Sequence, residues 1–273
     1  MNARAASWSV NGALGAAVAL TVFPLLWMVS VSLMPSGASV GYPPPILPSH
    51  ATLSHYRELF AQQHMGRYFL NSVIVAASAT LLALLFNGMA GYAFAKLKFR
   101  GREGLYRVLL AGLLVPAQVT MIPLFGLLKA LGLVNSYAGA IVPSAASIFG
   151  IFLVRQYALS IPDELLDSAR IDGASEWRIF RSIVVPLLVP VLVTLGILVF
   201  LGTWNDFMWP LIVLTDRDMQ TLPVALAGLS REHVQDNEMM MAGSVVTVLP
   251  VLVLFLVLQR HYIQGLLSGA VKG

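Results

Sequence analysis

Long apolar runs constrain this chain more than any other feature of its sequence. A helix of roughly 20 apolar residues is needed to cross a hydrocarbon core about 30 Å thick. Apolar residues make up 58% of the 273 positions and charged residues only 11%, which exceeds what a water-soluble domain of this length needs for its core. Six runs are long enough, at residues 10–33, 69–95, 108–128, 137–154, 183–207 and 242–258. The sequence therefore predicts an all-α integral membrane protein with six transmembrane helices in one domain, residues 1–273.

The first and fourth runs differ from a plain spanning helix. The first follows Arg4 but is longer than the apolar core of a signal peptide, which has about 7–15 residues. The fourth is short and contains Pro143 and Gly150, which neighbouring helices can accommodate in a bilayer. We expect both runs to remain in the membrane as spans.

The distribution of basic residues predicts the orientation, because Lys and Arg are enriched in cytoplasmic loops. With both termini inside, the inner segments contain 12 of the 17 Lys and Arg residues. The outer segments contain only Arg57, Arg67, Lys129, Arg217 and Arg231. We therefore expect both termini to face the cytoplasm, together with the loop at residues 160–182. Topology also accounts for the net charge of +4, so no nucleic-acid ligand is needed to explain it.

The sequence lacks the motifs that several kinds of chemistry require. There is no G-x-x-x-x-G-K-[ST] loop, so the chain has no evident route to binding ATP phosphates and its energy source lies elsewhere. Zero Cys excludes thiolate ligands and nucleophiles, and the five His residues show no metal-ligand spacing. We expect no catalytic residue and no metal site, which makes a membrane-embedded enzyme an unfavoured alternative.

An ion-coupled secondary carrier is a second alternative, since such carriers usually place ionisable residues inside the membrane. The central portions of the first four runs and the sixth contain none, and Asp206, in the outer part of the fifth run, is the nearest case. Trp204, Asn205 and Asp206 together offer an aromatic face and two polar groups that suit a sugar crossing the membrane. An interpretation of equal weight is that Trp204 is an interface anchor and that Asp206 faces a water-filled crevice. Both interpretations stay open.

The longest charged segment between apolar runs is at residues 160–190, and it predicts helix, turn, helix. Ser160 and Pro162 are typical of a helix start, whose first turns favour the acids that follow. Those acids are Asp163, Glu164 and Asp167. Asp172-Gly173 predicts the break, and Ser175 begins the second helix. We expect Leu165, Leu166 and Ala169 to form an apolar face that docks into a partner's groove.

This segment resembles the cytoplasmic coupling loop of binding-protein-dependent ABC importers, in which E-A-A-x-x-x-G precedes an apolar stretch ending in Pro. The matching residues are Asp167, Ser168, Ala169, Asp172, Gly173, Ala174, Phe180, Ile183, Pro186 and Pro190. Asp167 replaces the usual Glu and Ser168 the first usual Ala, so Glu164 is an alternative bearer of the essential carboxylate.

Further stretches resemble the permeases of carbohydrate ABC importers, especially the smaller permease of the maltose type. The matching stretches are 70–72, 90–95, 99–101, 122–124, 204–207, 264–266 and 269–273, and the resemblance extends over nearly all of the chain, with its weakest part before Tyr56. The resemblance implies the type I importer fold, with the helix-turn-helix of residues 160–182 coupling to an ATPase. It implies a bacterial inner-membrane protein that imports a sugar or oligosaccharide by alternating access. Glycerol-phosphate or another polar solute is the alternative cargo.

The resemblance also implies partners and contact residues. The partners are a second related permease, two ATPase subunits that bind ATP and Mg, and an extracytoplasmic sugar-binding protein; this chain itself binds no cofactor. The implied coupling residues are Glu164, Asp167, Ser168, Ala169, Asp172, Gly173 and Ala174. Within the C-terminal tail at 261–273, the resemblance places Gly269, Ala270, Val271, Lys272 and Gly273 near the ATPase. The outer loop at 216–238 is similar to one that reaches the binding protein; a solvated connector is the equal alternative.

Overall fold

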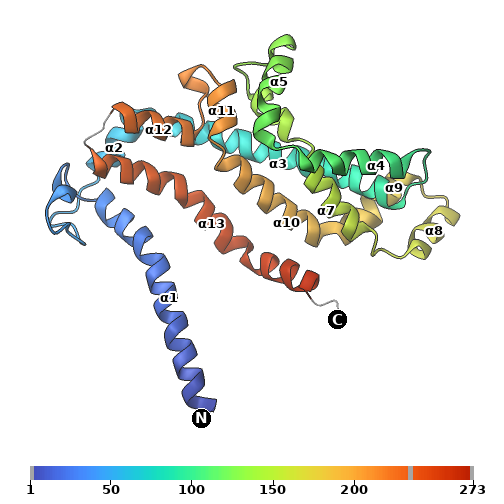
Figure 1. Ribbon diagram of the computed structural model, residues 1–273, viewed down its shortest axis with the longest axis horizontal. Helices are drawn as coiled ribbons and strands as arrows, with labels where there is room; N and C mark the ends of the chain where they lie inside the picture. The colour runs from blue at the N-terminus through green and yellow to red at the C-terminus, as the bar shows by residue number, and fades with distance from the viewer. Residues whose placement is uncertain (1–2, 233–235, 271–273) are drawn as a thin grey trace. The chain divides into compact units, whose positions relative to one another are not determined.

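The computed structural model describes residues 3–232 and 236–270, and side chains over residues 10–229 and 236–257. Throughout these described ranges the regular elements are helices, and no strand occurs (Figure 1). The chain divides into two compact units. Unit 1 comprises Met1–Arg67 and Ala225–Leu252, and unit 2 comprises Tyr68–Val224 and Val253–Gly273.

Unit 1 is held together by a buried carboxylate. Its elements are α1 (Ala3–Ser32), α2 (Ser54–Ala61), the first residues of α3 (Met65–Lys96), most of α12 (Leu222–Glu232) and the first part of α13 (Asn237–Ala270). The Glu238 side chain, at the start of α13, is fully buried and accepts hydrogen bonds from the backbone N–H groups of Gly37 (3.2 Å) and Ser39 (2.7 Å). The loop that follows α1 is thereby fixed to α13.

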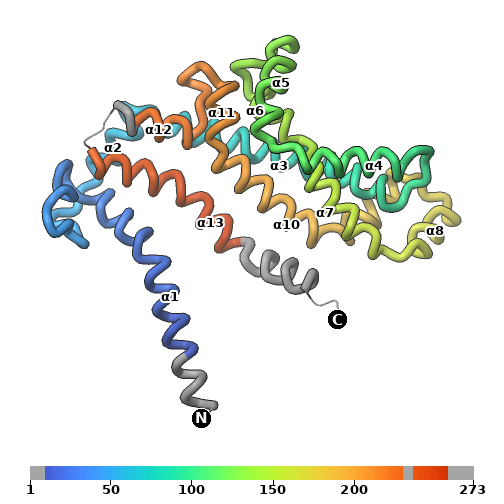
Figure 2. The backbone as a smooth tube through the Cα atoms, viewed as in Figure 1, coloured from blue at the N-terminus to red at the C-terminus, as the bar shows by residue number. Residues whose placement is uncertain are grey.

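Unit 2 contains the rest of α3 and most of the remaining helices, traced in Figure 2. They are α4 (Arg102–Ala111), α5 (Ala117–Ala130), α6 (Tyr137–Ile141), α7 (Ile148–Ala158), α8 (Asp163–Ile171), α9 (Glu176–Ile179), α10 (Val185–Trp204) and α11 (Met208–Val213). A π-helical turn over Phe180–Val184 joins α9 to α10, because Pro186 disturbs the regular hydrogen-bond ladder there. Single 3₁₀ turns of this unit lie at Gly112–Leu114, Val142–Ser144 and Arg217–Met219, and unit 1 contains one at Ala38–Val40.

Helix α3 packs against both ends of unit 2. At one end Tyr92 and Ala95 join a buried cluster with residues of α7, α8 and α10, including Val154, Leu166 and Leu188. At the other end Val75 and Ala79 join a second cluster, with Leu128, Ala140, Ile141, Trp209 and Val213 of α5, α6 and α11. Unit 2 is thus organised around one long helix.

Four helical stretches of the described chain are long and apolar enough to cross a membrane: Val10–Ser32, Met65–Lys96, Glu176–Trp204 and Asn237–Val257. They coincide with four of the six predicted runs. The other two runs are bent rather than straight, by 108° between Arg102–Leu114 and Ala117–Ala130 and by 40° between Tyr137–Ser144 and Ile148–Ala158. Counting each bent pair as one span gives six.

Prolines explain the two bends. Pro116 lacks a backbone N–H and pushes Val115 into an extended conformation (φ −87°, ψ 119°), so the helix stops before it and restarts after it. The second bend contains Pro143, and Ser147 then caps α7 by accepting the Gly150 N–H at 3.0 Å. Asn87 of α3 accepts the freed N–H of Ser147 at 2.9 Å. The break in the backbone is therefore satisfied by a side chain from a neighbouring helix, as the apolar phase requires.

Helices α3 and α7 lie in tight contact at Gly91. A Cβ atom at this position would lie 2.6 Å from Cβ of Val154 and 3.0 Å from the backbone N of Arg155. At Gly126 of α5, by contrast, a Cβ atom would meet nothing within 4 Å.

We predict that Gly91→Ala lowers the thermal stability of the detergent-solubilised protein, because overpacking costs about 1–3 kcal/mol. Gly126→Ala is the control and should leave the melting temperature unchanged or raise it, since Ala is the better helix former. Equal melting temperatures for the two variants would show that α3 and α7 do not pack this closely.

Candidate functional site

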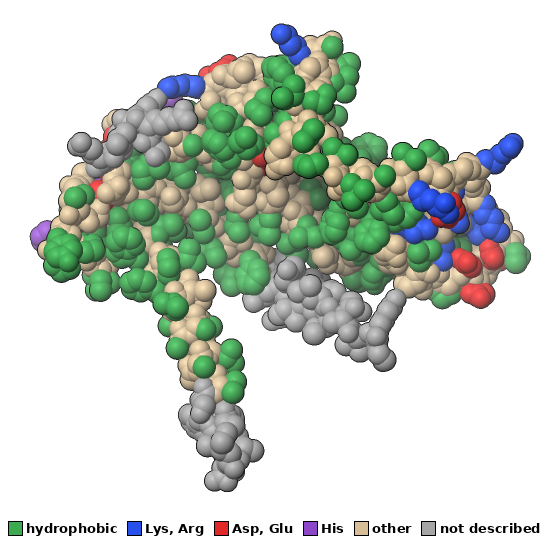
Figure 3. All heavy atoms as spheres, viewed as in Figure 1, with side chains coloured by type: hydrophobic (Ala, Val, Ile, Leu, Met, Phe, Trp, Pro, Cys, Tyr) green, Lys and Arg blue, Asp and Glu red, His purple; other side chains and the backbone are tan. Residues whose placement is uncertain are grey.

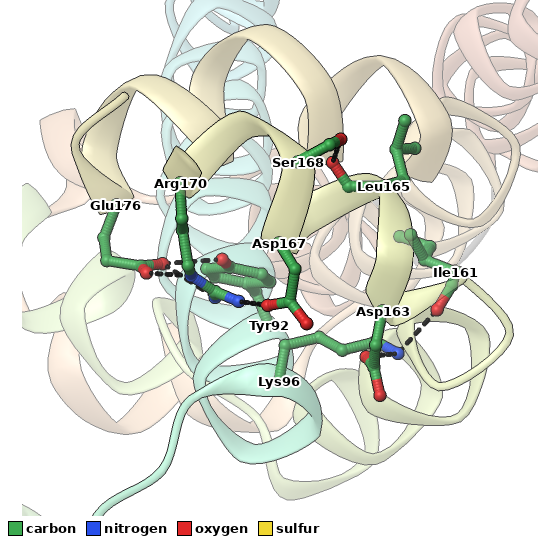
Figure 4. Close-up of polar contacts among 9 residues, drawn as sticks. All are labelled: Tyr92, Lys96, Ile161, Asp163, Leu165, Asp167, Ser168, Arg170 and Glu176. Carbon is green, nitrogen blue, oxygen red and sulfur yellow. Dashed lines mark hydrogen bonds and ion pairs between the residues drawn. The ribbon is translucent and has the colours of Figure 1, made fainter. Parts of the chain in front are cut away.

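The start of α8 is fixed by a buried lysine at the end of α3. The Lys96 side chain is only 6% exposed, and its ammonium group donates to the Ile161 carbonyl and, at 2.7 Å, to the Asp163 carboxylate (Figure 4). This hydrogen bond, together with the positive charge, holds the pKa of the exposed Asp163 carboxyl below its usual range. The start of the helix-turn-helix predicted at residues 160–182 is therefore bonded to the end of α3.

The turn after α8 is a complete glycine cap. Gly173 has φ 79°, a conformation that L-residues with side chains rarely adopt. Its N–H donates to the Arg170 carbonyl and the Ala174 N–H donates to the Ala169 carbonyl, both at 3.0 Å, which are the two bonds of a Schellman motif. Ser175 then caps α9 by accepting the Arg178 N–H. The predicted break at Asp172-Gly173 is confirmed.

Arg170 links the two arms of this turn. Its guanidinium donates to Asp167 within α8 and to Glu176 at the start of α9, each at 2.7 Å. Glu176 also accepts a hydrogen bond from the Tyr92 hydroxyl of α3 at 2.9 Å (Figure 4). The bonds to Glu176 and Asp167 raise the pKa of Arg170 further above its usual value, so it stays charged. The network connects α8, α9 and α3.

The three residues predicted to form an apolar docking face do not share one exposed surface. Leu166, 1% exposed, and Ala169, 8% exposed, pack into the chain's own core with Ile179 and Val184, so they are not available to a partner. Leu165 remains exposed, and Ile171 is 86% exposed. Ile171 was not among the residues singled out from the sequence, although its spacing from Glu164, Asp167 and Ser168 puts all four on one helix face.

The two candidate carboxylates on this face have different surroundings. Asp167 is engaged by Arg170. Glu164 is exposed and makes no ion pair with any residue whose side chain is described. Ser168 donates back to the Leu165 carbonyl of its own helix at 3.0 Å, and Asp172 is the exposed C-cap residue.

The tentative substrate-path residues lie in one turn but have separate roles in the fold. Trp204 is 1% exposed, with its ring stacked on Phe200 at 5.7 Å between centroids and edge-on to Phe69 at 5.8 Å. It is a core residue rather than an interface anchor or an open sugar platform. Asn205 is exposed and donates to the Leu201 carbonyl, while Asp206 accepts the Trp209 N–H at the start of α11.

The predicted outer loop at 216–238 is structured where it is described. It contains a 3₁₀ turn over Arg217–Met219 and all of α12. Asn71 of α3 donates to the carbonyls of Asp218 and Gln220, both at 2.8 Å, and accepts from the Tyr137 hydroxyl. Residues 233–235 lie outside the described residues. So do Val271, Lys272 and Gly273 of the predicted tail, whereas Gly269 and Ala270 end α13.

Within the described part of the chain, no group of three or more His, Asp or Glu residues could hold a metal ion. The side chains brought together around α8 form ion pairs and hydrogen bonds that fix two helices. They present no nucleophile paired with a base.

Comparisons with known proteins agree with this geometry. Residues 87–268 match the family model described as the binding-protein-dependent transport system inner membrane component. The arabinooligosaccharides transport system permease protein AraQ of Halalkalibacterium halodurans is 39% identical, over 98% of this chain and 97% of that one. The lactose transport system permease protein LacG of Rhizobium radiobacter is 35% identical, over 95% of this chain and 94% of that one. The trehalose transport system permease protein SugB of Mycobacterium tuberculosis is 34% identical, over 99% of this chain and 98% of that one.

A solved structure has the same fold. It is a crystal structure of a bacterial ABC transporter involved in the import of the acidic polysaccharide alginate, with a TM-score of 0.83 and 24% sequence identity. The match covers 95% of this chain and 98% of that one.

We predict that Glu176→Gln loosens α8, because the substitution removes the charge that pairs with Arg170 and weakens the bond to Tyr92. Ion pairs at this exposure are worth up to about 1 kcal/mol, so amide hydrogen exchange across Asp163–Ile171 should accelerate by up to about fivefold. Arg178→Gln, at an exposed position of the same helix, is the matched control and should exchange at the original rate. Unchanged exchange in Glu176→Gln would mean that the ion pair does not hold α8.

Proposed function

The chain belongs to the family of binding-protein-dependent transport system inner membrane components, and we propose that it is the permease subunit of an ATP-driven importer for a sugar or oligosaccharide. The observation that carries this proposal is the match along nearly the whole chain to permeases named for arabinooligosaccharide, lactose and trehalose transport. A relative named as an osmoprotective compounds uptake permease, 33% identical, favours a polar osmoprotective solute as the second candidate cargo.

We place the chain in a bacterial cytoplasmic membrane as six spans with both termini inside. The two bent helix pairs count as the third and fourth spans. The excess of Lys and Arg in the inner segments supports this orientation. A second related permease pairs with the chain as the other half of the pathway, two ATPase subunits bind ATP and Mg, and a soluble sugar-binding protein docks outside. The chain itself carries out no covalent chemistry.

In this proposal α8 is the element on which the ATPase acts. Its exposed face offers Glu164, Ser168 and Ile171, while Leu166 and Ala169 anchor the opposite face in the core. Because Asp167 is engaged by Arg170, we assign the acidic ATPase contact to Glu164 and a positioning role to Asp167. Movement of α8 is transmitted to α3 through Lys96 and to α10 through α9.

The resemblance-based contacts at Gly269–Gly273 remain a proposal that rests on sequence alone. For the substrate path, the burial of Trp204 leaves Asn205 and Asp206 as the polar groups that the pathway would use. Alternating access requires that partners contact the two states differently. The binding protein and ATP favour the outward-facing state, and hydrolysis resets the inward-facing state.

The central test is reconstitution of this chain in liposomes, with and without the ATPase and the second permease, using a labelled oligosaccharide and its binding protein. Uptake that requires ATP and all partners supports the importer. Uptake by the chain alone, driven by an ion gradient, would instead show a secondary carrier.

We predict that Ile171→Ser lowers sugar-stimulated ATP hydrolysis of the assembled complex by about tenfold, because a fully buried Ile contributes about 1.5–3 kcal/mol at an interface. Its melting temperature should not change, since the side chain is exposed in the free chain. Leu131→Ser, at another exposed apolar position (61% exposed, against 86% for Ile171) on the predicted outer side, is the control. Normal stimulation in Ile171→Ser would remove this face of α8 from the ATPase contact.

We also predict that Asn205→Leu reduces uptake severalfold without changing basal ATP hydrolysis, because it removes a hydrogen-bonding group worth about 0.5–1.5 kcal/mol to a polar solute. The measurement is initial uptake of labelled sugar by proteoliposomes. Thr194→Val is the control, because the Thr194 hydroxyl bonds the carbonyl four residues before it, as the Asn205 amide does, but lies outside the proposed substrate path. Full uptake by Asn205→Leu would exclude this residue from the pathway.

A further inference from the structure

The turn between α3 and α4 combines a cationic hollow with an apolar helix face. Residues 96–107 contain five Lys and Arg residues and one acid, Glu103. A surface hollow of about 410 Å³ is lined by Lys98, Phe99, Gly101, Arg102, Glu103 and Gly104. In Figure 3, Lys and Arg side chains gather at the end of unit 2 where α3, α4 and α8 meet.

The single acid does not neutralise this hollow. The Glu103 carboxylate is 3.1 Å from Arg102 and 3.9 Å from Arg155, so its charge is already met. Asp163, the nearest acid of α8, is engaged by Lys96. Lys98, Arg100 and Arg107 are exposed and form no ion pair with the described residues. A surplus of positive charge therefore remains at the hollow.

Apolar side chains continue from the hollow along α4. Phe99 lines it, and Leu105 and Val108 follow one helix turn apart on the same face, 56% and 73% exposed. Because α3 ends as a membrane-spanning helix at Lys96 and α4 starts the next span, this turn lies at the edge of the bilayer. A ligand that fits must have an anionic head beside a hydrocarbon body.

We propose that this hollow binds the phosphate headgroup of an anionic phospholipid, with Lys98 facing the phosphate, the neighbouring Arg100 adding positive charge, and Phe99, Leu105 and Val108 against the acyl chains. Basic clusters next to a spanning helix attract anionic lipids by this electrostatic route. Charge complementarity and continuity with the apolar face favour a lipid over a soluble anion or a protein. The site is independent of which sugar is transported.

The test uses the whole transporter, purified and exchanged into a mixture of equal amounts of phosphatidylglycerol and phosphatidylcholine, with retained lipids counted by native mass spectrometry. We expect selective retention of phosphatidylglycerol. Lys98→Gln with Arg100→Gln should weaken it on the order of tenfold. Arg57→Gln with Lys129→Gln removes two exposed cations from the predicted outer side and should retain the lipid.

Gly104→Phe is a second variant, because it fills the hollow at a position where a Cβ meets nothing within 4 Å and leaves every charge in place. It should lose the lipid even if the charge variant fails to assemble. The proposal is overturned if the wild type shows no preference, if Gly104→Phe retains phosphatidylglycerol, or if the Arg57/Lys129 control loses as much. Displacement by inorganic phosphate at the same concentration as the lipid would reveal a soluble-anion site instead. Lipid counting needs no transport, so a negative result leaves the importer function untouched.

Discussion

Inside a bilayer, every interruption of a helix exposes backbone groups that have no water to bind, so each break needs a partner from elsewhere in the protein. In unit 2, α3 supplies such a partner to the break before α7 within a span, and it also bonds the predicted loops at either end of the spans. Asn71 bonds the carbonyls of the 218–220 turn, Asn87 accepts the free N–H group at the start of α7, and Lys96 bonds the carbonyl that precedes α8. Helix α3, whose sequence predicts only a plain apolar span, is therefore the scaffold on which the irregular segments depend.

In the proposed importer, the same contacts let α8 transmit force. A short helix in a loop would ordinarily move freely. Here one end is attached to Lys96, the other is closed by the Gly173 cap, and Arg170 ties both arms to Glu176. With Leu166 and Ala169 buried in the core, a push on the outer face of α8 displaces α3 and α10 rather than the loop alone.

The sequence predicted local structure well wherever a single residue type decides the backbone. Pro162, Gly173 and Ser175 mark the two helices at residues 160–182, because the proline ring fixes φ, glycine accepts the positive φ of the helix end and the serine hydroxyl caps a helix start. Hydropathy likewise found four long helices. It could not show that the 108–128 run folds back at Pro116, because a bent pair is as apolar as a straight one. Nor could helical spacing reveal that Leu166 and Ala169 face inward, since both faces of α8 carry apolar side chains.

Trp204 shows how the same limit applies to function. An aromatic residue beside two polar groups suggested a sugar platform, but which face of a membrane helix is lipid, core or pathway depends on neighbours distant in sequence. Here those neighbours are Phe69 and Phe200, which enclose the ring. The polar pair that follows is different, because Asn205 is the C-cap of α10 and Asp206, two residues before α11, accepts the Trp209 N–H. Capping side chains at a helix break are within reach of a passing hydroxylated solute and can bond it without breaking hydrogen bonds of the core. The pathway is therefore better sought at such breaks than along the middle of any span.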